Sequence, residues 1–125
     1  MKKTRAIAFI LCVALVLASA ALVSCAKKTS FTLRIIDKDG KENKYTVKTD
    51  DKTVGDALIT AKYLPADSKD AGIFDTLNNI KADYSVDQSY WMFEVNGKVS
   101  DKGVFDVDVK DGDIYTFTYT IFEME

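Results

Sequence analysis

Four aspartates near the C-terminal end have the chemistry and the spacing of a site for a hard cation. Asp106 and Asp108 alternate along one segment, and Asp111 and Asp113 flank a glycine a few residues later. Alternate residues of an extended segment point to one face, and calcium takes several carboxylate and carbonyl oxygens. The group lacks the closing glutamate of the usual calcium loop. The competing interpretation is that Asp111 and Asp113 shape a turn and the other two are solvated; Asp37–Gly40 is a weaker group with the same two interpretations.

Aromatic side chains form a second candidate group, suited to a flat ligand. Tyr84, Tyr90 and Trp91 lie in or beside a loop that leads into an apolar segment, and Tyr115 and Tyr119 follow later. Rigid aromatic side chains give a large contact area with few rotamers. Trp91 alternates with apolar neighbours, so a core position competes with a ligand-binding role for this residue. We predict Tyr84, Tyr90 and Trp91 as ligand-binding residues.

The sequence lacks the usual nucleophile and base pairs of enzymes. It has no histidine, and its two cysteines, Cys12 and Cys25, both lie near the N-terminus. Serine–histidine and cysteine–histidine systems are therefore excluded, and zinc or copper would lack their preferred ligands. No glycine-rich phosphate loop is present. These features favour a binding protein over an enzyme.

The N-terminal segment has the features of an export signal. Three basic residues within the first five positions precede an uncharged, apolar run over residues 6–23. A positive start followed by such a run and small residues is typical of a cleaved signal peptide. Leu22-Val23-Ser24-Cys25 resembles the lipobox of bacterial lipoproteins, in which the cysteine is lipidated and becomes the first residue after cleavage. A membrane-spanning helix with an incidental Cys25 is the alternative.

This resemblance divides the chain into a signal peptide (1–24), a lipidated cysteine with a short tether (25–30) and one domain (31–125). Cleavage would leave 14 basic and 19 acidic residues, a net charge of −5. Such an acidic domain is a poor partner for nucleic acid. Cys25 would be the one remaining cysteine, so no disulfide is available. We expect the domain at the extracytoplasmic face of the cell membrane, held there by lipid.

Local patterns predict a hairpin, a helix and then further strands. Period-two alternation predicts strands and helical spacing predicts a helix, while Gly, Pro and Asn mark turns. The first half is predicted to contain a hairpin of strands 31–36 and 44–49, a helix over 54–63 capped by Thr53, a loop over 66–72 and an undecided segment 73–80. The second half is predicted to contain a loop over 83–89, a strand over 90–95 and the turn Asn96-Gly97. A return over 98–109, with Val104 in or near a short strand, a turn over 110–113 and a last strand over 114–122 complete the prediction. This order predicts an α+β fold, a β-grasp-like mixed sheet with one covering helix.

The second half of the sequence resembles a known family. The segments Trp91–Gly97, Gly103-Val104 and Lys110–Asp113, with the aromatic last strand, are similar to the C-terminal domain of transcobalamin and intrinsic factor; Thr53–Leu58 also fits that pattern. In those vitamin carriers this domain closes over one face of cobalamin, and a large helical domain, which has no counterpart here, holds the other face. The resemblance implies a β-grasp binding domain and a corrinoid or another small molecule as its ligand.

Three functions therefore stand open. The leading hypothesis is a membrane-anchored binding protein that takes a corrinoid or other small ligand and passes it to a membrane transporter. The first alternative is a protein that binds a divalent cation through the aspartate cluster. The second is a docking or adhesive module that engages another envelope protein through a sheet edge.

Overall fold

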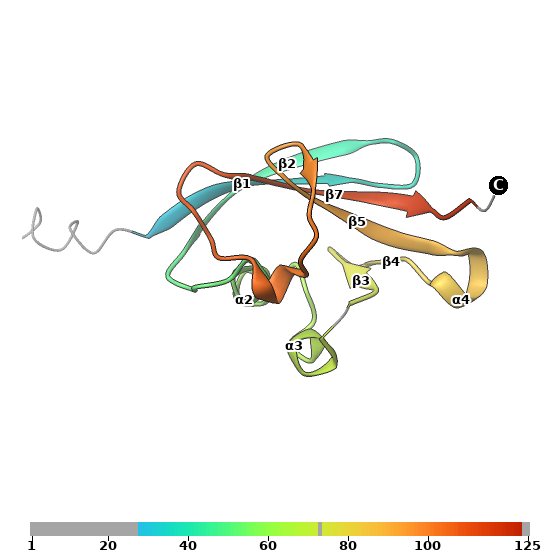
Figure 1. The fold of residues 1–125 in the computed structure, drawn as a ribbon, viewed down its shortest axis with the longest axis horizontal. Helices are drawn as coiled ribbons and strands as arrows, with labels where there is room; N and C mark the ends of the chain where they lie inside the picture. The colour runs from blue at the N-terminus through green and yellow to red at the C-terminus, as the bar shows by residue number, and fades with distance from the viewer. Residues whose placement is uncertain (1–27, 73, 124–125) are drawn as a thin grey trace, which may run out of the picture.

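The computed structural model describes residues 28–72 and 74–123, and a mixed sheet forms its main layer (Figure 1). The predicted signal peptide and Cys25 lie outside the described residues. In chain order the elements are β1 (Thr29–Ile36), β2 (Glu42–Thr49), α2 (Val54–Thr60), α3 (Ser68–Ala71), β3 (Thr76–Leu77), β4 (Ile80–Lys81), α4 (Tyr84–Asp87), β5 (Ser89–Val95), β6 (Lys98–Val99), η1 (Val104–Asp106) and β7 (Ile114–Ile121).

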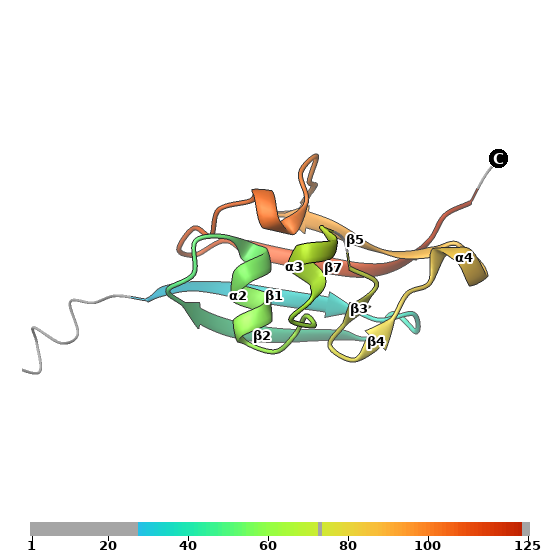
Figure 2. The ribbon, with the colours of Figure 1, turned by 90° about the horizontal axis from the view of Figure 1, so that it is seen from below.

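The main sheet has the strand order β2-β1-β7-β5-β6. The pairing of β1 with β7 is parallel, and the other neighbours are antiparallel. The expected α+β class with a mixed sheet is therefore confirmed. Figure 2 shows α2, α3 and the small β3–β4 hairpin over one face of this sheet.

The core lies between that face and α2. Apolar residues alternate along β1, so that Phe31, Leu33 and Ile35 all face the core and are buried. Helix α2 adds its own apolar stripe of Val54, Ala57 and Leu58. Core residues contributed by β5 and β7 are Trp91, Tyr115 and Phe117. The helix comes close to η1 at Gly55, where an added Cβ would lie 2.3 Å from the Phe105 ring, so glycine is required at this position.

Helix α2 begins as predicted and ends earlier. The Thr53 side chain accepts a hydrogen bond from the Asp56 backbone N–H at 3.2 Å, which confirms the N-cap. The helix was expected to run to Tyr63, but it ends at Thr60. Lys62 adopts a left-handed φ of 68°, and the Tyr63 N–H turns back to the Leu58 carbonyl. This Schellman-type turn, rather than the later proline, ends the helix.

Two segments expected as loops contain short helices. The predicted loop 66–72 holds α3, and the predicted loop 83–89 holds α4. The undecided segment contains the β3–β4 hairpin, turned by Asn78 and Asn79 with φ of 50° and 65°. Asparagine tolerates these left-handed values better than most residues, which suits a two-residue turn.

The return after Asn96-Gly97 is shorter than predicted. Strand β6 has two residues and pairs only with the end of β5. Val104 was expected in or near a strand, but it lies in the 3-10 helix η1 and is buried against the core. Apolar burial therefore fixes Val104 without any strand pairing. The β1 strand also begins two residues earlier than expected, because Thr29 and Ser30 of the predicted tether already pair with β2.

The two ends of the sheet differ in what they carry. Because β1 and β7 are parallel, both start at the same end of the sheet, while α4 lies at the opposite end (Figure 1). Within residues 28–72 and 74–123, no helix is long and apolar enough to cross a membrane.

Candidate functional site

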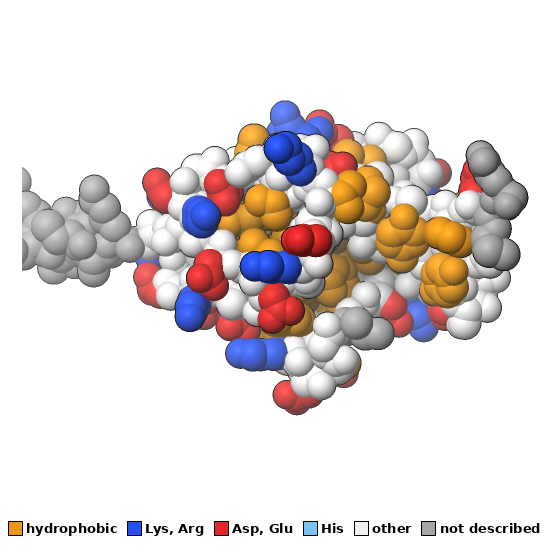
Figure 3. Space-filling model, in the orientation of Figure 1, with side chains coloured by type: hydrophobic (Ala, Val, Ile, Leu, Met, Phe, Trp, Pro, Cys, Tyr) orange, Lys and Arg blue, Asp and Glu red, His pale blue; other side chains and the backbone are white. Residues whose placement is uncertain are grey.

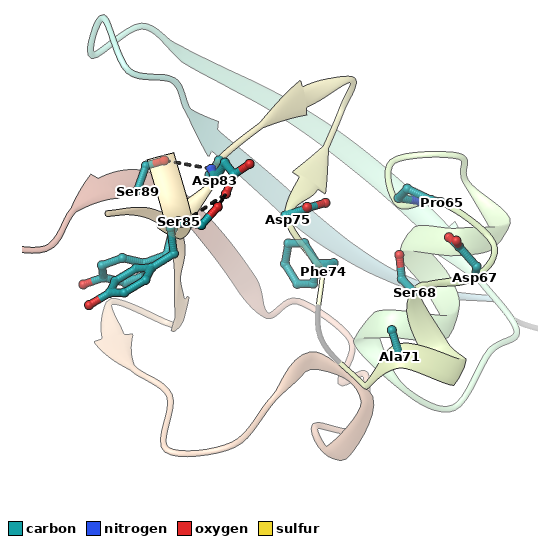
Figure 4. Close-up of a pocket in the computed structure, with 12 residues that line it drawn as sticks. Pro65, Asp67, Ser68, Ala71, Phe74, Asp75, Asp83, Ser85 and Ser89 are labelled. Atoms are coloured by element: carbon teal, nitrogen blue, oxygen red, sulfur yellow. Dashed lines mark hydrogen bonds between the residues drawn. The ribbon is translucent and has the colours of Figure 1, made fainter. Parts of the chain in front are cut away.

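An open hollow of about 470 Å³ lies near the α4 end of the sheet (Figure 4). Segments that precede and contain α3, β3 and α4 meet there with the start of β5. The residues that line the hollow are Pro65, Asp67, Ser68, Ala71, Phe74, Asp75, Ala82, Asp83, Tyr84, Ser85, Ser89 and Tyr90. A volume of this size falls in the range of small-molecule sites in proteins.

A second hollow of about 210 Å³ shares two of these residues, Phe74 and Tyr90. Trp91 and Phe93 line it from β5, Lys102 and Gly103 line it from the loop before η1, and Val104 lines it from the start of η1. We call the two hollows together the aromatic groove. Apolar side chains gather over the half of the molecule toward α4 in the space-filling view (Figure 3).

The aromatic groove contains all three predicted ligand-binding residues. Tyr84 and Tyr90 are exposed to 54% and 37%. Trp91 is only 8% exposed, and its Nε1 donates to the Asp75 carbonyl at 3.2 Å. Its ring also makes an edge contact with Tyr119, with centroids 5.6 Å apart. Trp91 thus serves the core and forms one wall of the second hollow, so the two interpretations of this residue are compatible.

Short hydrogen bonds fix α4 and with it Tyr84. Asp83 caps the helix by accepting from the Ser85 backbone N–H and hydroxyl, at 3.0 and 2.6 Å. The Ser89 hydroxyl accepts from the Asp83 N–H and donates to the Asp87 carboxylate. Figure 4 shows Asp83 bonded to Ser85 and to Ser89.

These bonds also set the ionisation of the two aspartates. Donation from Ser85 holds the pKa of Asp83 below its usual value, and donation from Ser89 does the same for the pKa of Asp87. Both carboxylates are therefore ionised at neutral pH.

Several groove residues carry no signal in the sequence. Phe74, Asp67, Ser68 and Asp75 come from segments with no clear period, and only the fold brings them beside Tyr84. Pro65 and the cluster of polar residues after it indicated only a loop. No local pattern could have identified these residues.

Two of the predicted metal ligands, Asp111 and Asp113, lie at the other end of the sheet and hold structure together. Asp111 accepts from the Ser30 backbone N–H at 2.9 Å, which ties the last turn to the start of β1. Asp113 accepts from the Asn96 side chain at 3.0 Å and from the Tyr115 hydroxyl at 3.1 Å. Burial, with a smaller effect of the Asp113 carboxylate, raises the pKa of Tyr115 to about 12. We call the region around Asp111, Asp113, Asn96 and Tyr115 the acidic end.

The other two aspartates do not complete a cluster. Asp106 lies in η1 and Asp108 forms a bridge with Thr53, so they do not share one face of an extended segment as predicted. Within residues 28–72 and 74–123, no group of three acidic, histidine or cysteine side chains is placed to hold a metal ion. Asp37, in the weaker acidic group, accepts from the backbone N–H groups of Asp39 and Lys41 and so shapes its turn. The metal site therefore stays a prediction without support from this geometry.

The fold and groove define a small α+β domain, with one covering helix on a mixed sheet and an aromatic hollow at one end of it. The chain belongs to the family described as Domain of unknown function (DUF4430), whose model matches residues 51–120, more than half of the sequence. No curated protein matches the chain.

Two solved structures are similar. One is a candidate metal binding protein from Ruminococcus gnavus ATCC 29149, with 26% identity and a TM-score of 0.68 over 77% of this chain and 100% of the other. The second is haptocorrin in complex with Cbi, with 10% identity and a TM-score of 0.57 over 77% of this chain. The matched part is 26% of haptocorrin, and at this identity the likeness concerns the fold alone.

Proposed function

We propose that this chain is a lipid-anchored binding protein of the cell envelope that takes a small ligand in the aromatic groove and catalyses no reaction. The observation that carries the proposal is the meeting of Tyr84, Tyr90 and Trp91 with Phe74 around two adjoining hollows. Convergent aromatic side chains in a concave surface are the usual form of a small-molecule site. The absence of histidine from the whole sequence favours binding over catalysis.

We take a corrinoid as the first ligand to consider, because the sequence resembles the C-terminal domain of transcobalamin and intrinsic factor. The strand order supports a β-grasp fold, and haptocorrin, which shares the fold, is in complex with Cbi. The groove is open, so it suits contact with one face of a large flat ligand and leaves the other face to a partner. A membrane transporter is the partner we propose.

The anchor we propose is the lipid on Cys25. The first strand begins four residues later at Thr29. So short a tether would keep the domain close against the membrane, within reach of a membrane transporter. The end of the sheet where β1 starts lies opposite α4 (Figure 1). Mass spectrometry of the membrane fraction tests the anchor, which predicts a lipid-modified Cys25 at the N-terminus.

Titration with cobalamin tests the ligand. The full chain in non-ionic detergent is expected to shift the visible absorbance of the corrinoid. Replacing Tyr90→Ala should weaken binding about tenfold, because it removes an aromatic wall shared by both hollows. Ile114→Ala is the matched control, since Ile114 is 40% exposed at the other end of β7. If both substitutions weaken binding equally, or if neither weakens it, the aromatic groove is not the binding site.

Divalent cation binding is the second candidate, because a similar structure at 26% identity is a candidate metal binding protein. Calcium should then raise the thermal midpoint, since a ligand of the native state stabilises it. The calcium-induced rise should vanish in the double variant Asp111→Ala, Asp113→Ala. If the rise persists there, the site is elsewhere. If neither calcium nor cobalamin changes the midpoint, the docking module becomes the better explanation.

A further inference from the structure

The charged side chains that line the larger hollow are all acidic. Three carboxylates line it, those of Asp67, Asp75 and Asp83, and no lysine or arginine does. Lys81 lies 3.5 Å from Asp83 and offsets that charge. Asp67 and Asp75 make no ion pair with another described residue, so two negative charges remain uncompensated around the opening.

A hydroxyl adds a hydrogen-bonding group to the same hollow. Ser68 is only 4% exposed as a residue and lines the hollow. It lies beside Ala71 on α3, with Asp67 next to it (Figure 4). Among the described residues the buried side-chain atom without a partner is Thr116 Oγ1, so the Ser68 hydroxyl is not a buried unpaired group, and a ligand in the hollow can replace water as its partner.

Aromatic faces complete the arrangement. The Phe74 ring lies next to Asp75 and across from Ser68 (Figure 4). Tyr84 and Tyr90 line the same hollow. Aromatic faces attract cations, most strongly where water is partly excluded. An anionic ligand would meet only repulsion from this set of side chains.

We propose that the larger hollow binds organic cations, with a protonated amine near Asp67, Asp75 and Ser68 and an apolar body against Phe74, Tyr84 and Tyr90. This inference rests on the proposed function and names the chemical class that the site selects. Each exposed carboxylate and the aromatic faces favour a cation by a few-fold at ordinary salt. Together they should give a preference of about tenfold over a neutral ligand of the same shape.

Three probes of one shape test the charge preference. They are 2-phenylethylammonium, 2-phenylethanol and 3-phenylpropanoate, titrated against the full chain in non-ionic detergent. Trp91 is the only tryptophan in the sequence and bonds to the Asp75 carbonyl, so its fluorescence reports binding. The ammonium ion should bind about tenfold more tightly than the alcohol, and the carboxylate should bind most weakly. Equal binding of the ammonium ion and the alcohol overturns the inference.

A double variant in the hollow, with a single-site control on α3, locates the effect. Asp67→Asn with Asp75→Asn should lower the affinity for the ammonium ion about tenfold and leave the alcohol unchanged. Asp70→Asn is the control, because Asp70 is an exposed carboxylate of α3 that does not line the hollow. Full retention of ammonium affinity in the double variant overturns the inference.

The two proposals fail differently. If cobalamin or the alcohol binds but the ammonium ion shows no preference, the binding function stands and the cation preference falls. If the folded chain binds none of the three probes and no cobalamin, both fall together.

Discussion

The acidic end and the larger hollow of the aromatic groove lie at opposite ends of one sheet and differ in how some of their carboxylates are used. At the acidic end Asp111 and Asp113 each accept hydrogen bonds from groups of other turns and strands. In the larger hollow Asp83 caps α4, but Asp67 makes no side-chain cap on α3. Carboxylates that accept such bonds stabilise a fold, whereas a carboxylate at a hollow without them is available to a ligand.

This contrast separates the two candidate groups of the sequence. The four carboxylates from Asp106 to Asp113 predicted a cation site as the first alternative, yet Asp111 and Asp113 hold the turns around Gly112 and Asn96. The aspartates of the groove are eight residues apart in the sequence and form no local pattern. Proximity in the sequence therefore indicated structural bonds here, whereas the proposed site consists of residues that only the fold brings together.

The largest effect on stability is expected from Asp113→Ala. The change removes the acceptor of the Asn96 amide and of the Tyr115 hydroxyl. Loss of two bonds to a charged acceptor should lower the free energy of unfolding by about 2 kcal/mol, measured by urea denaturation. Binding in the groove should be unchanged.

Asp106→Ala is the control for this experiment, because Asp106 is exposed and no side-chain bond to it is seen. Its effect should stay within about 0.5 kcal/mol. Similar losses in both variants would show that the acidic end is not held by the bonds described.

A smaller effect is expected in alkali from the buried tyrosine. Burial raises the pKa of Tyr115 to about 12, above the value near 10 expected in the unfolded chain. The native state therefore keeps the Tyr115 proton at pH values where the unfolded state has lost it. The contribution of the protonated hydroxyl to the free energy of unfolding is full below pH 10 and is lost as the pH rises from 10 to 12. From pH 9 to 11 it should fall by about 1 kcal/mol.

Tyr115→Phe removes this titration, so the free energy of unfolding is measured for the parent and for this variant at each pH. Other tyrosines and lysines titrate in both proteins, so the quantity to compare is the difference in unfolding free energy between parent and variant. That difference should narrow between pH 9 and 11. A constant difference would mean that the hydroxyl titrates alike in both states.

Local chemistry predicted much of the frame. The β1–β2 hairpin, the Thr53 cap, the strand before Asn96-Gly97 and the last strand each depend on neighbouring residues that act together. A two-residue turn or a cap is decided within a few residues, so the sequence contains the answer.

The elements that were missed depend on distant contacts. Helices α3 and α4 have four residues each, too few for a periodic pattern. Val104 is fixed in η1 by burial against the core rather than by its own neighbours. The same reason explains the groove, where Tyr84 and Tyr90 could be named in advance and Phe74, Ser68 and Asp75 could not.

The smallest effect on stability, with a clear effect on binding, is expected from Tyr84→Ala. Tyr84 is 54% exposed and contacts only Phe122 among the aromatic rings described, with centroids 6.3 Å apart. Its loss should change the free energy of unfolding by less than about 0.5 kcal/mol. Because Tyr84 lines the larger hollow, its loss should still weaken binding of 2-phenylethylammonium several-fold.

Val86→Ala is the control on the same helix, because Val86 is 79% exposed and does not line the hollow. It should change neither the free energy of unfolding nor the affinity for 2-phenylethylammonium. If Tyr84→Ala lowered stability as much as Asp113→Ala, Tyr84 would be a structural residue like those of the acidic end, and the division between the two ends would fail.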